Sequence, residues 1–276
     1  MAKYKLTDET KEFRGRVLHR IVCVTAFASV AVGDTGGWAE SEKNLSHDGN
    51  AWVSGNAQVY GNAQVYGDAR VSGDARVYGN AWVSGNAQVY GDARVYGNAQ
   101  VYGNAQVYGN AWVSGDAWVS GNAQVYGNAR VYGNAWVYGN AQVYGDARVS
   151  GDARVYGNAQ VYGNAQVSGD ARVYGDARVS GDAWVYGDAR VYGDARVSGD
   201  ARVMSEKDYV VLKNTWSSGR YFTYTASNGK WSVGCFYGTG EELVAKAFCD
   251  SELSGKCYEA AVKFVEELER LKKEDA

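Results

Sequence analysis

"GNAQVYGNAQVYGDARVSGDARVYGNAWVSG", from Gly55 to Gly85, repeats one six-residue phrase. Alanine comes every sixth residue, followed two positions later by valine, then by tyrosine or serine, glycine, and asparagine or aspartate. The register begins at Ala51 and ends at Val203, with 25 complete hexads and no insertion or deletion. A fixed period kept over so long a stretch is the signature of a repeat architecture.

One hexad, Ala57 to Asn62, shows what each repeat can form. Ala57 and Val59 are two residues apart, so on a strand they share one face, and Gln58 and Tyr60 share the other. The closing Gly-Asn pair tolerates positive φ, which a sharp corner needs. Each hexad therefore predicts a short strand followed by a bend, with a narrow apolar face made only of Ala and Val.

Two folds are compatible with this pattern. A meander with Gly-Asn and Gly-Asp hairpins would make one very large sheet, whose Ala/Val face would need a covering layer that the chain does not contain. In a solenoid, the chain bends the same way after each hexad, and Ala and Val fill a thin tube. The solenoid leaves no apolar residue uncovered, and we therefore favour it.

The repeat also resembles a known pattern. The hexad Val59 to Gln64 (VYGNAQ) resembles the hexapeptide repeat of left-handed parallel β-helices, with Val59 in the inward aliphatic place and Ala63 in the small place. That resemblance implies three hexads per coil, hence an 18-residue coil. The chain departs from the family where tyrosine follows valine, a position on the surface. The expected fold is mainly β: a left-handed parallel β-helix with a small C-terminal α+β domain.

The segment before the repeat is similar to a second pattern. KYKLT at 3–7, VLHRI at 17–21, GDTGGW at 33–38 and NLS at 44–46 resemble the start of YdcK-like hexapeptide-repeat proteins of bacteria and their phages. The resemblance implies an N-terminal cap and no particular activity. Because repeat arrays need atypical ends, the expected organisation is a cap at 1–50, a solenoid at 51–203 and a small domain at 204–276.

With three hexads per coil, each residue lies under the one three hexads later, and the surface can be unrolled into columns. One surface, here named the Gln/Tyr face, shows the same two residues on five consecutive coils. Stacked amides can form hydrogen-bonded ladders, and rings at this spacing can stack. The repetition has two interpretations, self-stabilisation of the rod or a flat recognition surface. The Gln/Tyr face comprises Gln88, Tyr90, Gln106, Tyr108, Gln124, Tyr126, Gln142, Tyr144, Gln160 and Tyr162.

The other two surfaces are less uniform. The second mixes arginine with tryptophan, and the third passes from Gln and Trp to a row of arginines. The second carries Arg76, Arg94, Trp112, Arg130, Arg148 and Trp184, and the third carries Gln64, Trp82, Gln100, Trp118, Trp136, Arg154, Arg172 and Arg190.

The segment from 204 to 276 predicts a three-stranded sheet and two helices. Strands are expected at 208–215, 221–225 and 231–237, with Asn228-Gly229 as a hairpin turn between the last two. Thr239 and Glu242 fit a capping box that opens a helix to about 248, and a second helix is expected at 255–273. The aromatic residues are expected to form the core, or alternatively a binding surface; they are Tyr209, Trp216, Tyr221, Tyr224, Trp231 and Tyr237.

The residue types of the array argue against catalysis. It contains no Cys, His, Lys or Glu, so general acid–base chemistry would depend on corner aspartates, for which a turn role is more usual. His19 and His47, the two histidines of the chain, lie outside the array and are expected to be packing or surface residues. We predict no catalytic residue, no metal site and no cofactor, and the cysteines form no zinc-binding pattern.

Charge and hydropathy limit which partners and which compartment can be expected. The net charge is -3, and the array holds 12 Asp against 11 Arg, so no nucleic-acid partner is expected. The apolar run at 21–32 is too short to span a bilayer and follows about twenty polar residues, unlike a signal peptide. It predicts a buried strand pair, no membrane association and a cytoplasmic location.

These observations predict a non-enzymatic scaffold or binding protein of bacterial or phage origin. It would act through rigid flat faces or its end domains on an unknown protein or small-ligand partner, and it could form a homo-oligomer. One alternative, suggested by the kind of genome the resemblance implies, is a phage-encoded antagonist of host immunity that sequesters a ligand or protein. A more remote alternative is an acyltransferase, because many left-handed β-helices have that activity.

Overall fold

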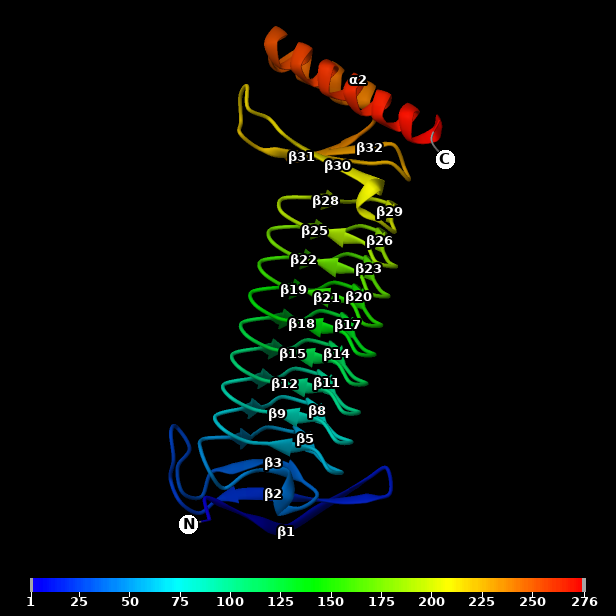
Figure 1. Cartoon of the computed structure of the whole chain (residues 1–276). Coiled ribbons are helices and arrows are strands. Elements are labelled where there is room, and N and C mark those ends of the chain that lie inside the picture. Colours follow the sequence, from blue (N-terminus) through cyan, green and yellow to red (C-terminus); the bar gives the residue numbers. More distant parts are fainter. Residues whose placement is uncertain (1, 275–276) are drawn as a thin grey trace.

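The computed structural model of the chain describes residues 2–274. The protein is a rod with a small sheet at one end, a stack of coils in the middle and a sheet with two helices at the other end (Figure 1). The two termini lie at opposite ends of the rod.

The middle of the rod is built from two-residue strands, one in every hexad. They run from β4 (Trp52–Val53) to β29 (Arg202–Val203) at six-residue intervals. Each pairs in parallel with the strand three hexads later, as β13 (Gln106–Val107) does with β16 (Gln124–Val125). The strands form three sheets, to which the array contributes columns of nine, nine and eight strands, so there are about nine coils. The predicted parallel β-solenoid with an 18-residue coil is confirmed.

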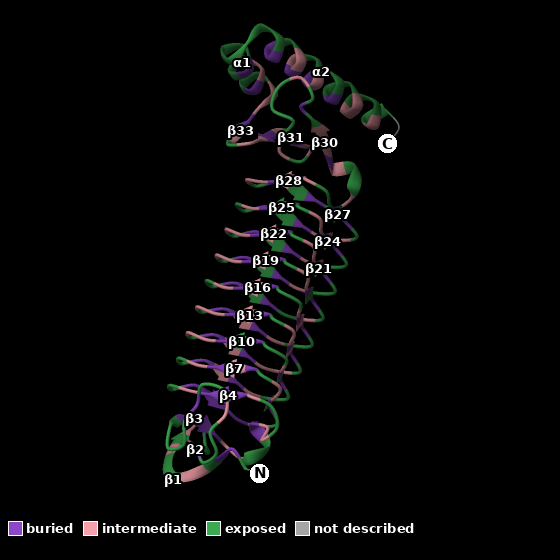
Figure 2. Cartoon of the chain, turned by 90° about the vertical axis from the view of Figure 1, so that its left-hand side faces the viewer, coloured by how far each residue is buried: buried purple, intermediate pink, exposed green. Residues whose placement is uncertain are grey.

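The interior of the tube is filled as the hexad predicts. Every alanine and every valine of the array, from Ala51 to Val203, is fully buried. Figure 2 shows these buried positions as a continuous run inside the stacked coils, with exposed residues at the corners. The apolar core therefore extends along the whole rod, although each coil contributes only six small side chains.

Glycine closes each hexad for two separate reasons, as Gly121 shows. Its φ of +66° is in the left-handed region that favours glycine. A Cβ atom at this position would also lie 3.0 Å from the backbone nitrogen and 3.0 Å from the backbone oxygen of Gly139, one coil further along. Because the corners stack this closely, Asn122 N can donate to the Gly139 carbonyl at 2.7 Å.

The N-terminal segment continues one sheet of the solenoid. β1 (Tyr4–Phe13) and β2 (Arg16–Cys23) are antiparallel, and β3 (Thr35–Ala39) pairs with β2 on one side and in parallel with β5 (Gln58–Val59) on the other. A 3-10 helix, η1 (Glu42–Asn44), follows.

The buried strand pair predicted at 21–32 is wrong. Only the first three residues of that run belong to β2, and the rest is a loop with a single bridge between Phe27 and Val30. Val32 is 65% exposed, so apolar composition alone did not mean burial here.

The last segment forms a sheet of four antiparallel strands under two helices. The strands are β30 (Tyr209–Lys213), β31 (Tyr221–Thr225), β32 (Lys230–Val233) and β33 (Phe236–Gly238). They follow a 3-10 helix, η2 (Glu206–Asp208), and precede α1 (Gly240–Asp250) and α2 (Glu252–Glu274).

The sequence predicted this arrangement except for one strand. The expected strand at 231–237 is two strands, because Gly234, at φ +58°, turns the chain between them. The capping box is confirmed: Thr239 Oγ1 accepts from Glu242 N at 3.2 Å, and Glu242 Oε2 accepts from Thr239 N at 2.7 Å.

The exposed edges of the end coils are covered by polar side chains as well as by strands. At the first coil, the buried Asn44 Nδ2 donates to the carbonyl oxygens of Gly61 at 3.0 Å and Ala63 at 2.9 Å. At the last coil, Arg196 N donates to Thr223 Oγ1 at 2.9 Å. One coil earlier, the equivalent nitrogen, that of Arg178, donates to a backbone carbonyl. Side chains thus replace the missing next coil.

Candidate functional site

The predicted columns of the Gln/Tyr face are confirmed. Its five glutamines lie on β10 (Gln88–Val89), β13, β16, β19 (Gln142–Val143) and β22 (Gln160–Val161), which are neighbours in one sheet. Each glutamine pairs in register with the next one along the rod, and the tyrosine columns follow two residues later. The valine between each Gln and Tyr points into the core, so both outer side chains point to solvent. Whether this face binds a partner stays a prediction.

The five tyrosines form a continuous stack. Successive ring centroids are 4.8 to 5.0 Å apart, and successive ring planes differ by 1 to 4°. Partial burial raises the pKa of Tyr126, and the neighbouring Tyr108 and Tyr144 raise it further because adjacent phenolates would repel. The five rings are therefore parallel across five coils, and stacking between neighbours favours the neutral form of Tyr126.

The glutamine amides of this face do not pair with one another. Among residues 2–274, no hydrogen bond joins a Gln of this face to another side chain, so the predicted glutamine ladder is not formed. The amide ladder runs instead along the corners, as from Asn104 to Asn122 at 3.0 Å and from Asn122 to Asn140 at 3.0 Å. Several corner ladders end on an aspartate, because its carboxylate accepts a hydrogen bond but cannot donate one to the next coil. In one of them, Asn158 donates to Asp176, the last member.

The Gln/Tyr face has distinct ends. On the N-terminal side, Ser54 and Ser72 replace tyrosine in the column, and a hollow of about 370 Å³ opens between Trp52 and Tyr90. On the C-terminal side the column continues with Ser180 and Ser198, whose hydroxyls are 3.2 Å apart. The five stacked tyrosines therefore project further than the serines on either side of them, and we call this part of the face, from Tyr90 to Tyr162, the plateau.

The glutamine column is replaced by arginine at both ends of that plateau. Arg70 pairs in register with Gln88 on one side, and Arg178 with Gln160 on the other. The five Gln/Tyr pairs carry no charge, and one arginine lies at each end of the glutamine column.

Two further tyrosine stacks lie on the other faces. Tyr60, Tyr78 and Tyr96 stack on the second face at 5.0 and 4.9 Å. A stack on the third face joins Tyr138, Tyr156, Tyr174 and Tyr192. Ring stacking alone therefore does not single out the Gln/Tyr face; its uniformity over five coils does.

Arginine and tryptophan also stack along the rod, a contact that the mixed Arg and Trp columns of the sequence did not by themselves predict. The Trp112 ring lies between the guanidinium groups of Arg94 and Arg130, each 4.9 Å from its centroid. A cation over an indole face is attracted by the ring quadrupole. Mixed Arg and Trp columns therefore have a structural role of their own.

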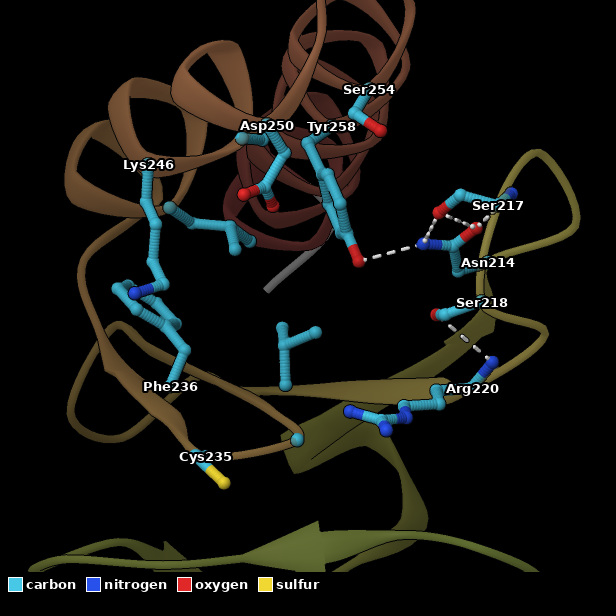
Figure 3. A pocket seen from close by; sticks show the side chains of 14 residues that line it. Asn214, Ser217, Ser218, Arg220, Cys235, Phe236, Lys246, Asp250, Ser254 and Tyr258 are labelled. Atoms are coloured by element: carbon cyan, nitrogen blue, oxygen red, sulfur yellow. Dashed lines mark hydrogen bonds between the residues drawn. The ribbon is translucent and has the colours of Figure 1, made fainter.

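A second hollow lies in the C-terminal domain, between the sheet and the two helices. It has a volume of about 330 Å³ and is lined by apolar residues, among them Leu243 and Phe236, and by several polar ones. In Figure 3, Arg220 projects into it from the sheet side and Asp250 from α1. Tyr258 is held by Asn214, whose Nδ2 donates to its hydroxyl at 3.0 Å.

The aromatic residues predicted for the C-terminal core divide into three groups. Trp231 is buried, and Trp216 and Tyr224 pack against the same cluster, which also contains Phe222. Tyr209 instead joins the core of the solenoid, and its hydroxyl donates to the Arg190 carbonyl at 2.9 Å.

The other two aromatic residues of that prediction are not in the core. Tyr237 is 43% exposed, and its hydroxyl donates to the Ser198 carbonyl on the last coil. Tyr221 is half-buried and is the first residue of β31, an inner strand of the sheet.

The two histidines occupy structural positions. His19 lies in β2, with Nδ1 3.1 Å from the Thr7 carbonyl oxygen. The His47 ring stacks on Tyr4 with centroids 4.3 Å apart. Both belong to the N-terminal segment that covers the first coil.

Two properties of residues 2–274 limit the chemistry. In this part of the chain, no three His, Cys, Asp or Glu side chains are grouped so that they could hold a metal ion. Neither of its helices combines the length and the apolar character needed to cross a membrane.

The fold and these surfaces define a class, the hexapeptide-repeat parallel β-solenoids. Within that class, the chain belongs to the YdcK beta-solenoid repeat family, whose repeat pattern matches in successive segments from residue 63 to residue 204. No curated protein matches the chain in sequence.

Fourteen chains of solved structures are similar to this one. One is LpxA from Acinetobacter baumannii, with a TM-score of 0.37 and 11% identity over 59% of this chain and 71% of the other.

Proposed function

We propose that the protein is a non-enzymatic binding protein whose solenoid presents the Gln/Tyr face to a protein partner. The observation that carries this proposal is the identity of five consecutive coils, with five Gln and five Tyr in strict register. Flat, preorganised tyrosine surfaces bind with little loss of side-chain entropy. The unpaired Gln amides add donors and acceptors that a partner backbone can use.

The charges at the two ends of the face define the partner further. Arg70 and Arg178 bracket an uncharged centre, so a matching surface would be polar in its middle and acidic at its ends. Two copies of the face placed antiparallel would bring Arg70 of one copy near Arg178 of the other. Because like charges would then meet, a different protein fits this face better than a second copy of the chain.

The proposal excludes acyl transfer as the activity of the array. None of its residues is a His, Cys, Lys or Glu, and no loop interrupts its coils to build a substrate cleft. The two histidines at 19 and 47 are engaged in the N-terminal segment. These observations support a binding role, in which rigidity rather than reactivity is the useful property.

The test is a variant that changes the face and spares the fold. Gln124→Glu, Tyr126→Lys and Tyr144→Lys together place charge in the centre of the plateau. A matched control, Tyr156→Lys with Tyr174→Lys, interrupts an equivalent stack on the third face. Both variants lose ring stacking of about 0.5–1.5 kcal/mol per pair, so any difference between them reports on the face itself.

The expected result is that a partner co-purifying with the wild-type protein also co-purifies with the control and is lost with the Gln/Tyr variant. Light scattering on the same samples gives the oligomeric state. A complex that survives in the Gln/Tyr variant would move the contact to the end domains and overturn the proposal.

The hollow in the C-terminal domain supports a second candidate, binding of a small ligand. Its apolar lining and the opposite charges of Arg220 and Asp250 suit a small molecule with an apolar body and polar ends. Native mass spectrometry of the protein purified from its own cells would show an added mass, and Arg220→Ala would remove it. A role as an antagonist of host immunity stays a prediction of the sequence resemblance.

A further inference from the structure

A cavity of about 240 Å³ opens on the third face, away from the Gln/Tyr face. Five residues from three consecutive coils line it: Tyr102, Trp118, Ser120, Trp136 and Tyr138. Four of the five are aromatic, and no charged group is among them. The cavity therefore differs from the arginine-rich half of the same face.

The cavity exists because one ring is missing from a column. Tyr102, Ser120 and Tyr138 follow one another at intervals of three hexads, so they occupy the same column on successive coils. Where tyrosines occupy adjacent coils, as Tyr138 and Tyr156 do, their rings stack at 4.8 Å. Ser120 carries no ring, so Tyr102 and Tyr138 are left two such steps apart. This gap has the thickness of one aromatic ring with a stacking contact on each side.

A tryptophan wall closes one side of the gap. Trp118 and Trp136 stack on each other at 4.8 Å with planes 4° apart. The Trp118 ring meets the Tyr102 ring edge-on at 6.3 Å, which shows that these indoles lean toward the column of the missing ring. The Ser120 hydroxyl lies at the base of the gap and can donate or accept one hydrogen bond.

Positive charge lies one coil beyond the wall. The guanidinium group of Arg154 is 5.1 Å from the Trp136 ring centroid, and Arg172 and Arg190 continue the same column. An aromatic ligand with an anionic substituent could therefore place its ring in the gap and its charge toward Arg154.

We propose that this gap is a binding site for one planar aromatic ring, sandwiched between Tyr102 and Tyr138 and preferably carrying a negative charge. The ligand ring would complete the interrupted tyrosine stack. Its edge would contact Trp136, which lines the gap. This site is independent of the proposed partner surface, because it lies on a different sheet of the solenoid.

The repeat itself supplies variants that fold. Tyrosine is the commonest residue at the position of Ser120 in the other hexads, and glutamine is common at the position of Trp136. Ser120→Tyr therefore inserts the missing ring from within the chain, and Trp136→Gln removes one of the two indoles of the wall. Ser150→Tyr makes the same chemical change on the second face and serves as the matched control.

The probe is indole-3-carboxylate, titrated into the full chain and followed by ligand-observed NMR. We expect measurable binding to the wild-type protein, with NOEs from the probe ring to Tyr102 and Tyr138. We expect Ser120→Tyr to weaken binding more than about tenfold and Trp136→Gln about three- to tenfold, as loss of aromatic stacking does in other sites. Ser150→Tyr should bind within about twofold of the wild-type protein.

Several results would overturn the proposal. They are absence of binding to the wild-type chain at about 10 mM probe, undiminished binding to Ser120→Tyr, or equal losses in Ser120→Tyr and Ser150→Tyr. If Ser120→Tyr did not fold, the decision would rest on Trp136→Gln and on the NOEs of the wild-type complex, and NOEs to other rings alone would also contradict the proposed site.

Discussion

Gly121→Ala tests how closely the corners of the solenoid stack, and Gly193→Ala is its matched control. Both glycines have positive φ, +66° and +62°. A Cβ at Gly121 would lie 3.0 Å from two backbone atoms of Gly139, whereas a Cβ at Gly193 would meet nothing within 4 Å. The two substitutions therefore share the cost of a left-handed alanine and differ in the contact with the next coil.

The magnitudes follow from these two terms. A left-handed alanine costs about 1–2 kcal/mol, and this is the whole loss expected for Gly193→Ala. Overpacking against a backbone that cannot move aside adds about 1–3 kcal/mol, so Gly121→Ala should lose about 2–5 kcal/mol in all.

The assay is urea unfolding of the full chain, followed by far-ultraviolet circular dichroism. The midpoint of Gly121→Ala should lie clearly below that of Gly193→Ala, which in turn should lie slightly below the wild-type midpoint. Equal midpoints for the two variants would refute the reasoning, because they would mean that adjacent corners are not in contact.

Three further predictions concern the cap, the tyrosines and catalysis. Asn44→Ala leaves the carbonyls of Gly61 and Ala63 without their side-chain donor, and should lower the free energy of unfolding by about 2–4 kcal/mol in urea titrations; an unchanged midpoint would show that Asn44 does not cover the first coil. Folding raises the pKa of Tyr108, Tyr126 and Tyr144 above the usual 10.0, so the folded state keeps these protons longer than the unfolded state. Their stabilising effect is complete below pH 10 and is lost as the pH rises further, so the melting temperature should fall steeply above pH 10 and less steeply for a Tyr126→Phe variant. Thiol release from acetyl-CoA with amine and hydroxyl acceptors should not exceed background, and turnover that disappears with His19→Ala or His47→Ala would assign the protein to a different class.

The sequence predicted the solenoid well because its signal is strictly periodic. The two-residue spacing of Ala and Val identifies the inner face of every strand, and the glycine corners fix the coil length once three hexads close a turn. The same arithmetic predicted which residues stack, including the five tyrosines of the Gln/Tyr face. The left-handed winding was inferred from resemblance and stays a prediction.

Features that depend on side-chain reach could not be predicted in the same way. Both Gln and Asn can form amide ladders, but the short Asn side chain at a tightly stacked corner reaches the next coil, as Asn122 does, while the longer Gln on the strand points to solvent. The gap at Ser120 is visible as a WVS hexad among WVY and QVY hexads, yet its shape depends on the direction in which Trp118 and Trp136 lean.

The C-terminal domain shows where local patterns are ambiguous. The segment 231–237 alternates like a single strand, and only the positive φ of Gly234 reveals the second hairpin. Tyr237 is a second example, because its hydroxyl accepts from Asn228 of its own domain and also donates to the Ser198 carbonyl of the last coil. Contacts between an array and its cap are specific to one chain, so the repeat pattern does not predict them.

The 18-residue register underlies every surface described above, and two deletions test it most directly. Removal of residues 123–140 takes out one whole coil and brings Gln106 and Tyr108 into register with Gln142 and Tyr144, so like residues still stack. Removal of Asn128 alone shifts every later side chain by one position and turns core valines outward. Thermal melts of both variants should show a change of only a few degrees for the 18-residue deletion and loss of cooperative folding for the single deletion. Equal damage in the two variants would contradict the register.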